Sequence, residues 1–310
     1  MHLSRRPNNI PFELVSNGSV ATIGAYDGIH LGHQKLLDNM LALAHANGLP
    51  SVVMSFEPTP KEYFSSSSPP ARLMRFREKV DALASYGIDL FYCPRFDEQM
   101  KNIEVDTFIR QLLIQSLNIR HLVIGDDFRF AKERQGNVDQ LRCAGKALEY
   151  EVHQVASVVE GGKRMSSTAI RQALQAGNLD DAALLLGRHY RMSGKVIEGA
   201  HLGKQLGFPT ANVNLGRKKS AVMGIFAVRV SGFGYQSLDA VASVGTRPTF
   251  GGTKPVLEVH IFDFDEDIYG KYIHVDFVAR LRSEQEFDQI RDLVEQMHCD
   301  AANAKAVLAA

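Results

Sequence analysis

The sequence predicts an α/β + β fold, in which a doubly wound parallel sheet is followed by a small antiparallel β-barrel with a C-terminal helix. Up to residue 186, strand-like apolar runs alternate with segments of helical period, which is typical of a parallel sheet covered by helices. From residue 187 onward, short strands are separated by glycine-containing turns, which is typical of a small barrel. We therefore expect two domains, residues 1–186 and residues 187–310.

The composition is that of an ordinary globular protein. Lys+Arg and Asp+Glu both number 35, so no overall positive charge would attract long nucleic acid. The three cysteines, Cys93, Cys143 and Cys299, form no Cys-x-x-Cys pair, which disfavours a zinc site and a disulfide framework. No run approaches the roughly 20 apolar residues of a membrane span, and the N-terminus has no signal-peptide core. We expect a cytoplasmic protein that binds neither nucleic acid nor membranes, and the oligomeric state stays open.

A candidate phosphate site follows the first predicted strand. Val20–Ile23 leads into Gly24–His33, which reads Gly-Ala-Tyr-Asp-Gly-Ile-His-Leu-Gly-His and runs into a helical period. Such a turn leaves backbone N–H groups free at the positive end of the helix dipole, where phosphates bind. His30 and His33 are three residues apart and therefore share one face of the first helical turn. The glycines and neighbours expected to hold a nucleotide are Gly24, Tyr26, Asp27, Gly28 and Gly32.

Three predicted loops should meet at one edge of the sheet. Gly24–His33, Glu57–Pro60 and Gly125–Phe130 each follow a strand-like run. In parallel sheets, ligands bind beyond the carboxyl ends of the strands, so these loops are candidates for contacting substrate.

A second hydroxyl-rich helix start is predicted at Ser166–Arg171, which reads Ser-Ser-Thr-Ala-Ile-Arg. Ser166 or Ser167 can cap this helix by accepting a backbone N–H. The same hydroxyls, with Thr168 and with Arg171 one turn further in, would also suit a phosphate. Both interpretations stay open at this level.

In the second domain, Gly199–Gly207 is a glycine-rich turn that contains Lys204. It departs from the Walker P-loop pattern, so general rules favour a plain loop. Thr210 and Asn212 follow, two apart on an extended chain, and could offer two neutral oxygens to Mg²⁺. An ordinary strand edge is the alternative.

A candidate general base lies on a later strand. In Leu257–Ile261 the apolar residues share one side, so Glu258 and His260 share the other. A glutamate there could accept a proton from an attacking hydroxyl, although a solvated strand glutamate fits equally well. A final helix is expected at Glu284–Met297.

His-x-Gly-His after a first strand, combined with Ser-Ser-Thr-x-x-Arg, resembles the nucleotidylyltransferase superfamily. Three runs in the second domain carry a separate resemblance, to a riboflavin kinase module: Leu206–Asn212 (Leu-Gly-Phe-Pro-Thr-Ala-Asn), Gly245–Phe250 and Leu257–His260. Over nearly its full length the chain resembles the bacterial bifunctional riboflavin kinase/FAD synthetase family. Ala25 and Tyr26 stand where this family often has Asn and Phe.

The resemblance implies two reactions. The second domain would phosphorylate riboflavin with ATP, with Glu258 as general base, Thr210 and Asn212 on Mg²⁺, and a loop over the nucleotide formed by Gly203, Lys204 and Gly207. The first domain would join AMP from ATP to FMN, giving FAD and pyrophosphate. The side chains implied around the ATP phosphates there are His30, His33, Ser166, Ser167, Thr168 and Arg171. Those implied on the substrate side are Asp126, Phe128 and Arg129.

Two other functions also fit parts of the sequence. His-Leu-Gly-His and Arg-Met-Ser-Ser-Thr resemble the signatures of class I aminoacyl-tRNA synthetases, but the chain is short for that role and lacks a basic tRNA-binding region. A flavin-binding carrier with a decayed site is the second alternative, against which the intact histidines and Glu258 argue.

Overall fold

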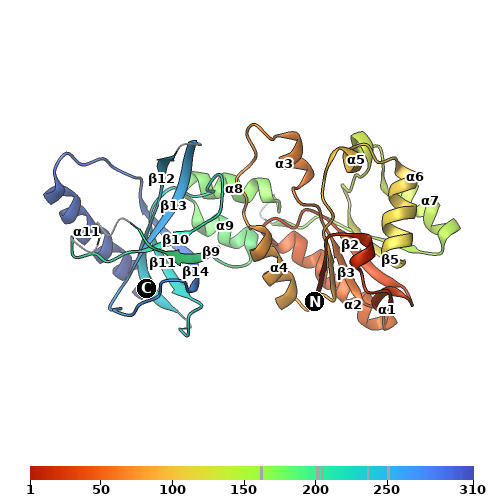
Figure 1. Cartoon of the computed structure of the whole chain (residues 1–310), viewed down its shortest axis with the longest axis horizontal. Helices are drawn as coiled ribbons and strands as arrows, with labels where there is room; N and C mark the ends of the chain where they lie inside the picture. The colour runs from red at the N-terminus through yellow and green to blue at the C-terminus, as the bar shows by residue number, and fades with distance from the viewer. Residues whose placement is uncertain (161–162, 200–202, 204–205, 236, 250–251) are drawn as a thin grey trace. The chain divides into compact units, whose positions relative to one another are not determined.

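The computed structural model describes residues 1–160, 163–199, 203, 206–235, 237–249 and 252–310 (Figure 1). The chain forms two compact units. The first comprises Met1–Pro70 and Phe76–Met165, and the second comprises Ala71–Arg75 and Ser166–Ala310. The second unit thus begins before residue 187, because α8 (Ser167–Ala176) and α9 (Leu179–Leu186) contact each other and α9 packs on two barrel strands. A functional boundary at 186/187 stays a prediction.

The first unit is built on six parallel strands in the order β1-β4-β3-β2-β5-β6. Their bounds are β1 His2–Ser4, β2 Ser19–Ile23, β3 Ser51–Met54, β4 Leu90–Tyr92, β5 Ile119–Gly125 and β6 Glu151–Val155. From β2 the chain proceeds to β3 and β4 on one side and then to β5 and β6 on the other. Ligands bind at such a reversal of strand order, so the loops after β2 and β5 border the expected site.

Helices cover both faces of this sheet. All five residues of the central strand β2 are therefore buried. The helix α2 (Leu31–Asn47) packs on β2, β3 and β5 and buries Leu37, Met40 and Ala44. The π-helical segment η2 (Phe108–Ser116) and α7 (Val138–Leu148) contribute to a separate core cluster with Ala21 and Ile23 of β2. The predicted doubly wound sheet is confirmed.

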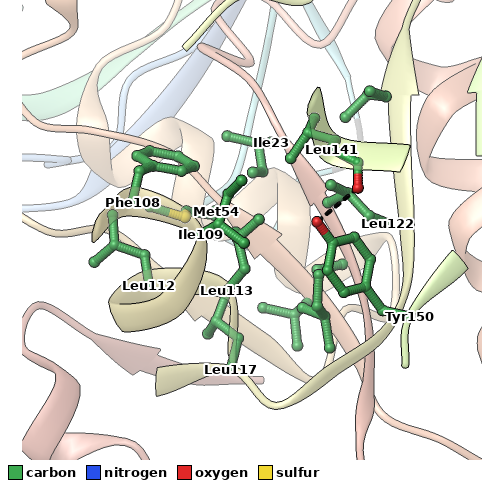
Figure 2. Close-up of a cluster of buried hydrophobic side chains, with 14 of the residues drawn as sticks. Ile23, Met54, Phe108, Ile109, Leu112, Leu113, Leu117, Leu122, Leu141 and Tyr150 are labelled. Carbon is green, nitrogen blue, oxygen red and sulfur yellow. Dashed lines mark hydrogen bonds between the residues drawn. The ribbon is translucent and has the colours of Figure 1, made fainter. Parts of the chain in front are cut away.

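Figure 2 shows that core cluster, in which apolar side chains of η2 meet those of the strands. Leu113 is fully buried, as are Met54 of β3 and Leu122 of β5. The hydroxyl of Tyr150 donates a hydrogen bond of 2.8 Å to the carbonyl oxygen of Leu141. Burial raises the pKa of Tyr150 to about 12, so the phenol stays neutral and its one polar atom is satisfied.

Shorter elements complete the first unit. They are η1 Pro7–Asn9, α1 Phe12–Val15, α3 Pro60–Phe64, α4 Phe76–Ser85, α5 Glu98–Lys101, α6 Val105–Thr107, η3 Lys132–Arg134, β7 Val159–Glu160 and β8 Lys163–Arg164. The strand β6 ends at Val155, and Val159 belongs to a separate two-stranded ribbon.

The second unit contains a closed barrel of six antiparallel strands in the order β10-β13-β12-β11-β14-β9, which confirms the predicted barrel. Their bounds are β9 Tyr190–Ile197, β10 Ala211–Asn214, β11 Gly224–Ser231, β12 Leu238–Thr249, β13 Gly252–Ile261 and β14 Tyr272–Arg282.

The C-terminal helix exists, but its predicted bounds of Glu284–Met297 are wrong. The helix α11 spans Ile290–Ala309. Residues 283–289 are mostly polar, whereas the alanine-rich stretch after residue 300 continues the helix and provides its packing face. Ala304 and Leu308 pack there against Ala227 and Val241 of the barrel.

We expect Leu113→Ala to lower the free energy of unfolding by about 2–5 kcal/mol, because it deletes a fully buried side chain and leaves a cavity. Urea unfolding followed by fluorescence or circular dichroism measures this loss. Leu184→Ala is the matched control, since Leu184 is 56% exposed, and it should change stability by no more than about 0.5 kcal/mol. Equal losses in the two variants would contradict the described core.

Candidate active sites

The loop after β2 has an unusual backbone conformation, which a buried side chain supports. Tyr26, Gly28 and Ile29 have positive φ angles of 49°, 91° and 41°. The Tyr26 side chain is fully buried, and its hydroxyl lies 2.7 Å from the Thr22 hydroxyl of β2. A Cβ on Gly24 would lie 3.0 Å from the Tyr26 ring, so glycine lets the ring pack under the loop. Tyr26 therefore supports the loop through packing.

The two predicted histidines are brought together at the start of α2. The Nδ1 atom of His30 accepts a hydrogen bond of 3.3 Å from the backbone N–H of His33, which makes His30 the N-cap of the helix. The two rings stack, with centroids 3.7 Å apart and planes at 18°. A Cβ on Gly32 would lie 3.1 Å from the Nδ1 atom of His30, so Gly32 gives the ring its place.

The Nδ1 atom of His33 is buried and has no hydrogen-bond partner among the residues that the structure describes. Burial, then His30 and then Lys79 lower the pKa of His33 well below its ordinary value, so this imidazole is neutral near pH 7. A buried polar atom without a partner is costly, and a ligand group would satisfy it.

A buried lysine that was not among the predicted site residues lies beside this loop. Lys79 of α4 is only 3% exposed, and its Nζ donates a hydrogen bond of 2.6 Å to the carbonyl oxygen of Ala25. The signal was present in the sequence: Lys79 lies three residues after Phe76 and four before Leu83, on the apolar face of the helix. A lysine on that face is either paired or functional.

The predicted substrate-side residues in the loop after β5 differ in their exposure and in their contacts. The carboxylate of Asp126 accepts hydrogen bonds from the Ser157 hydroxyl, at 2.6 Å, and the Ser157 N–H, at 3.1 Å. These bonds lower the pKa of Asp126. Phe128 is half-buried and stacks with Phe130 at 5.8 Å, whereas Arg129 is exposed. Asp126 therefore fixes the shape of the loop, and Arg129 is accessible to a ligand.

The hydroxyl-rich helix start lies in the second unit. The Ser166 hydroxyl accepts the N–H of Ala169 at 3.2 Å, which confirms the capping interpretation. The guanidinium of Arg171 donates to the carbonyl oxygens of Ala71, at 2.6 Å, and Ser167, at 3.1 Å. The first of these bonds ties α8 to the segment Ala71–Arg75, and the second lies within α8. A role for this helix start in one phosphate site with the histidines stays a prediction.

In the barrel, the register of the strands places two predicted site residues opposite each other. Asn212 of β10 lies directly opposite Glu258 of β13. Directly opposed residues of antiparallel strands have Cβ atoms about 5 Å apart on the same face. Because Leu257 and Val259 are fully buried, Glu258 lies on the other face of β13, where it is half-buried.

The glycine-rich stretch lies against both candidate metal ligands. A Cβ on Gly199 would lie 2.2 Å from the Nδ2 atom of Asn212 and 2.8 Å from its Oδ1 atom. A Cβ on Gly203 would lie 2.4 Å from the Phe208 carbonyl oxygen and 3.2 Å from the Thr210 hydroxyl. Glycine is therefore required at position 203, where backbone lies in the way, whereas at position 199 a methyl group would displace the Asn212 side chain. Lys204 lies outside the described residues.

His260 positions the segment that carries Thr210. Its Nδ1 lies 2.8 Å from the carbonyl oxygen of Pro209, and because a carbonyl only accepts, the ring nitrogen is the donor. The Phe208 ring packs on His260, with centroids 5.1 Å apart, and on His298 of α11, at 4.7 Å. Gly207 ends the preceding turn with a φ of 81°. The sequence analysis placed His260 beside Glu258 without giving it this role.

Known proteins resemble this chain over both halves. Residues 13–169 match the FAD synthetase family, and residues 186–308 match the riboflavin kinase family. A bifunctional riboflavin kinase/FMN adenylyltransferase of Escherichia coli (strain K12) is 42% identical over 305 residues, which cover 98% of this chain and 97% of that protein. The chain belongs to the bifunctional riboflavin kinase/FMN adenylyltransferase family. The enzyme phosphorylates riboflavin to FMN and adenylylates FMN to FAD.

A further member of the family and a solved structure also match nearly the whole chain. The Haemophilus influenzae protein of the same name is 41% identical over 292 residues, covering 94% of this chain and 95% of that one. A crystal structure from Streptococcus pneumoniae, named as a macrolide-efflux protein, has a TM-score of 0.80 and 30% identity and covers 96% of each chain. In the described part of the present chain, no helix is both long and apolar enough to cross a membrane. The family excludes the aminoacyl-tRNA synthetase alternative.

We expect His33 to make stability depend on pH. Its folded-state pKa is lowered, so below about pH 6.5 the unfolded chain binds a proton that the folded chain does not. Stability is therefore retained above that pH and lost as the pH falls. The free energy of unfolding should therefore fall as the pH is lowered from about 7.5 to about 5.5. His33→Gln should remove this part of the pH dependence of urea unfolding, and His189→Gln, an exposed histidine, should not.

We expect Gly199→Ala to reduce riboflavin phosphorylation roughly 100-fold, because its methyl group would displace the Asn212 side chain. Assays with riboflavin and ATP measure this loss. FMN adenylation by the same preparation is the internal control and should be unchanged. Phosphorylation at the wild-type rate would show that this close approach is not needed.

Proposed function

We propose that the stacked His30 and His33 stabilise the ATP phosphates while the FMN phosphate attacks the α-phosphorus. The observation that carries this role is the buried Nδ1 of His33 without a partner in the described ranges, at the helix start beside the central strand. The carboxyl end of that strand is where the sheet order reverses and where ligands bind. The free N–H groups and dipole of the α2 start add attraction for an anion.

Adenylyl transfer then needs little chemistry from the chain. A phosphate oxygen of FMN forms the new bond to the α-phosphorus, the bond to the β-phosphate oxygen breaks, and pyrophosphate leaves with the electron pair. Negative charge builds up on the oxygens around the α-phosphorus, where N–H donors are most effective. The Nδ1 atom of His30 accepts a hydrogen bond from the backbone, so in neutral His30 the proton is on Nε2, which donates.

The start of α8 is assigned to the same reaction. The FAD synthetase match runs to residue 169, beyond the compact-unit boundary at 165/166, and so includes Ser166, Ser167 and Thr168. Arg171 lies one turn further along the same helix. We assign these residues to the β- and γ-phosphates, Gly24, Asp27, Gly28 and Gly32 to the nucleotide loop, and Phe128 and Arg129 to the FMN side. Tyr26 and Asp126 act by shaping their loops.

For the kinase reaction we assign Glu258 as the general base. It would take the proton of the riboflavin 5′-hydroxyl as that oxygen attacks the γ-phosphorus and ADP leaves. The supporting observation is the register that sets Glu258 opposite Asn212. The hydroxyl of Thr210 and the amide oxygen of Asn212 are hard, neutral oxygens that suit Mg²⁺. When bound, the ion would neutralise charge on the ATP phosphates.

The remaining assignments follow from the same site. Gly203, Lys204 and Gly207 would cover the nucleotide, and His260 positions the Phe208–Thr210 segment through Pro209. Small-molecule substrates fit the family to which the chain belongs. A cytoplasmic location stays a prediction from the sequence.

Product analysis of two single variants tests these roles. With riboflavin, ATP and Mg²⁺, His33→Ala should accumulate FMN and form little FAD. Glu258→Gln should slow FMN formation by roughly 10²- to 10⁴-fold, because it removes the base while preserving shape, yet convert supplied FMN to FAD at the wild-type rate. Chromatographic separation of the three flavins gives both rates from one sample.

His189→Ala and Glu286→Gln are the matched controls, since both side chains are exposed. Both should leave the two rates unchanged. FAD formation by His33→Ala at the wild-type rate would remove His33 from the mechanism, and rapid FMN formation by Glu258→Gln would remove the general base. Flavin binding by the wild type without any product would return the carrier alternative.

A further inference from the structure

A second cluster of polar side chains lies at the edge of the parallel sheet. His121 of β5 pairs across the ladder with Glu151 of β6, and His153 follows two residues further along β6 on the same face. The Nδ1 atom of His121 and the Nε2 atom of His153 are 3.1 Å apart. The Oε2 atom of Glu151 lies 3.6 Å from the first and 3.5 Å from the second. Neither catalytic assignment uses these residues.

The three atoms form a triangle of the size that a tetrahedral metal ion requires. Ligand atoms held about 2.0–2.1 Å from Zn²⁺ in a tetrahedron are about 3.3 Å from one another. The measured separations of 3.1, 3.5 and 3.6 Å bracket that value. Two imidazoles and one carboxylate are also a ligand set that suits borderline divalent ions such as Zn²⁺ and Co²⁺.

The protonation state of the cluster favours a cation. Two nitrogens 3.1 Å apart cannot both carry a proton, so at least one imidazole is neutral there. An anion would be repelled by the Glu151 carboxylate, although Arg120 and Lys146 are close by.

The cluster opens onto a surface pocket of about 700 Å³, which His121, Glu151 and His153 line together with Arg120, Arg142 and Lys146. The side chain of Glu151 is 71% exposed, so it can close onto an ion, and the histidines are 16% and 33% exposed. His121 lies four residues before Gly125 on β5, about 13 Å along the strand from the catalytic edge.

We propose that His121, Glu151 and His153 form a binding site for a divalent transition-metal ion, with one ligand position left open toward the pocket. The ion would clamp the edge strand β6 to β5. It is separate from the Mg²⁺ assigned to the kinase site, because imidazole ligands select softer ions than Mg²⁺.

Metal titration of the full-length, tag-free enzyme tests the proposal. After chelator treatment, and in excess Mg²⁺, the wild type should bind one more Zn²⁺ ion in calorimetric titration than His121→Ala or His153→Ala does. Mutation of a residue that only hydrogen-bonds to a metal ligand weakens metal binding roughly 10- to 100-fold. Loss of a ligand itself should therefore weaken binding by about 100-fold or more. Co²⁺ in place of Zn²⁺ should give the strong visible absorption of a four-coordinate ion in the wild type only.

Glu151→Gln and His189→Ala are the comparison variants. Glu151→Gln removes an exposed carboxylate without removing packing, so it should fold and still lose affinity even if a histidine variant does not fold. His189→Ala removes an exposed imidazole and should bind as the wild type does. FMN adenylation without added Zn²⁺ should be unchanged in all of them. The same number of ions and the same affinity in the wild type, His153→Ala and Glu151→Gln would overturn the proposal and leave a plain histidine–histidine hydrogen bond.

Discussion

The hydrogen bond that His30 accepts from the backbone of His33 is the interaction on which the proposed adenylyltransferase site depends. It begins α2 and at the same time fixes the imidazole of His30 against that of His33. Serine, aspartate or asparagine would cap a helix better than histidine. The use of histidine at the N-cap therefore makes sense only if its second ring nitrogen is needed, and Gly32 and the buried Tyr26 shape the loop so that it can serve.

In the barrel a single alternation of buried and outward side chains specifies the core and aligns the residues proposed for the kinase reaction. Leu257 and Val259 are buried on one face of β13, which fixes the register, and that register sets Glu258 opposite Asn212. A slip of one residue would place the carboxylate in the apolar core, at a cost that the fold would not tolerate. The chain therefore cannot lose the alignment of this site without losing the packing of the strand.

The sequence predicted most strands and the shared helix face of His30 and His33, because these rest on local spacing. It did not predict features that depend on partners distant in the chain. β10 pairs with β13 and β9, so the contact between Asn212 and Glu258 follows from topology and not from spacing. The strand β1 has three residues, which are too few for a periodic signal. The burial of Lys79 depends on its hydrogen bond to the Ala25 carbonyl, a partner that is distant in the chain.

The boundary between the two compact units does not coincide with the boundary between the two family matches. α8 carries residues of the FAD synthetase match, yet it packs with the barrel unit. Ala71–Arg75 belongs to that unit as well: Arg171 donates to the Ala71 carbonyl, and Arg75 donates to the Ser193 carbonyl at 2.7 Å and the Tyr272 hydroxyl at 2.9 Å. A barrel fragment that began at residue 187 would lose all of these bonds. Its stability would then report the missing segments as much as the barrel, so point mutation in the whole chain is a sharper test of the two activities than cutting the chain there.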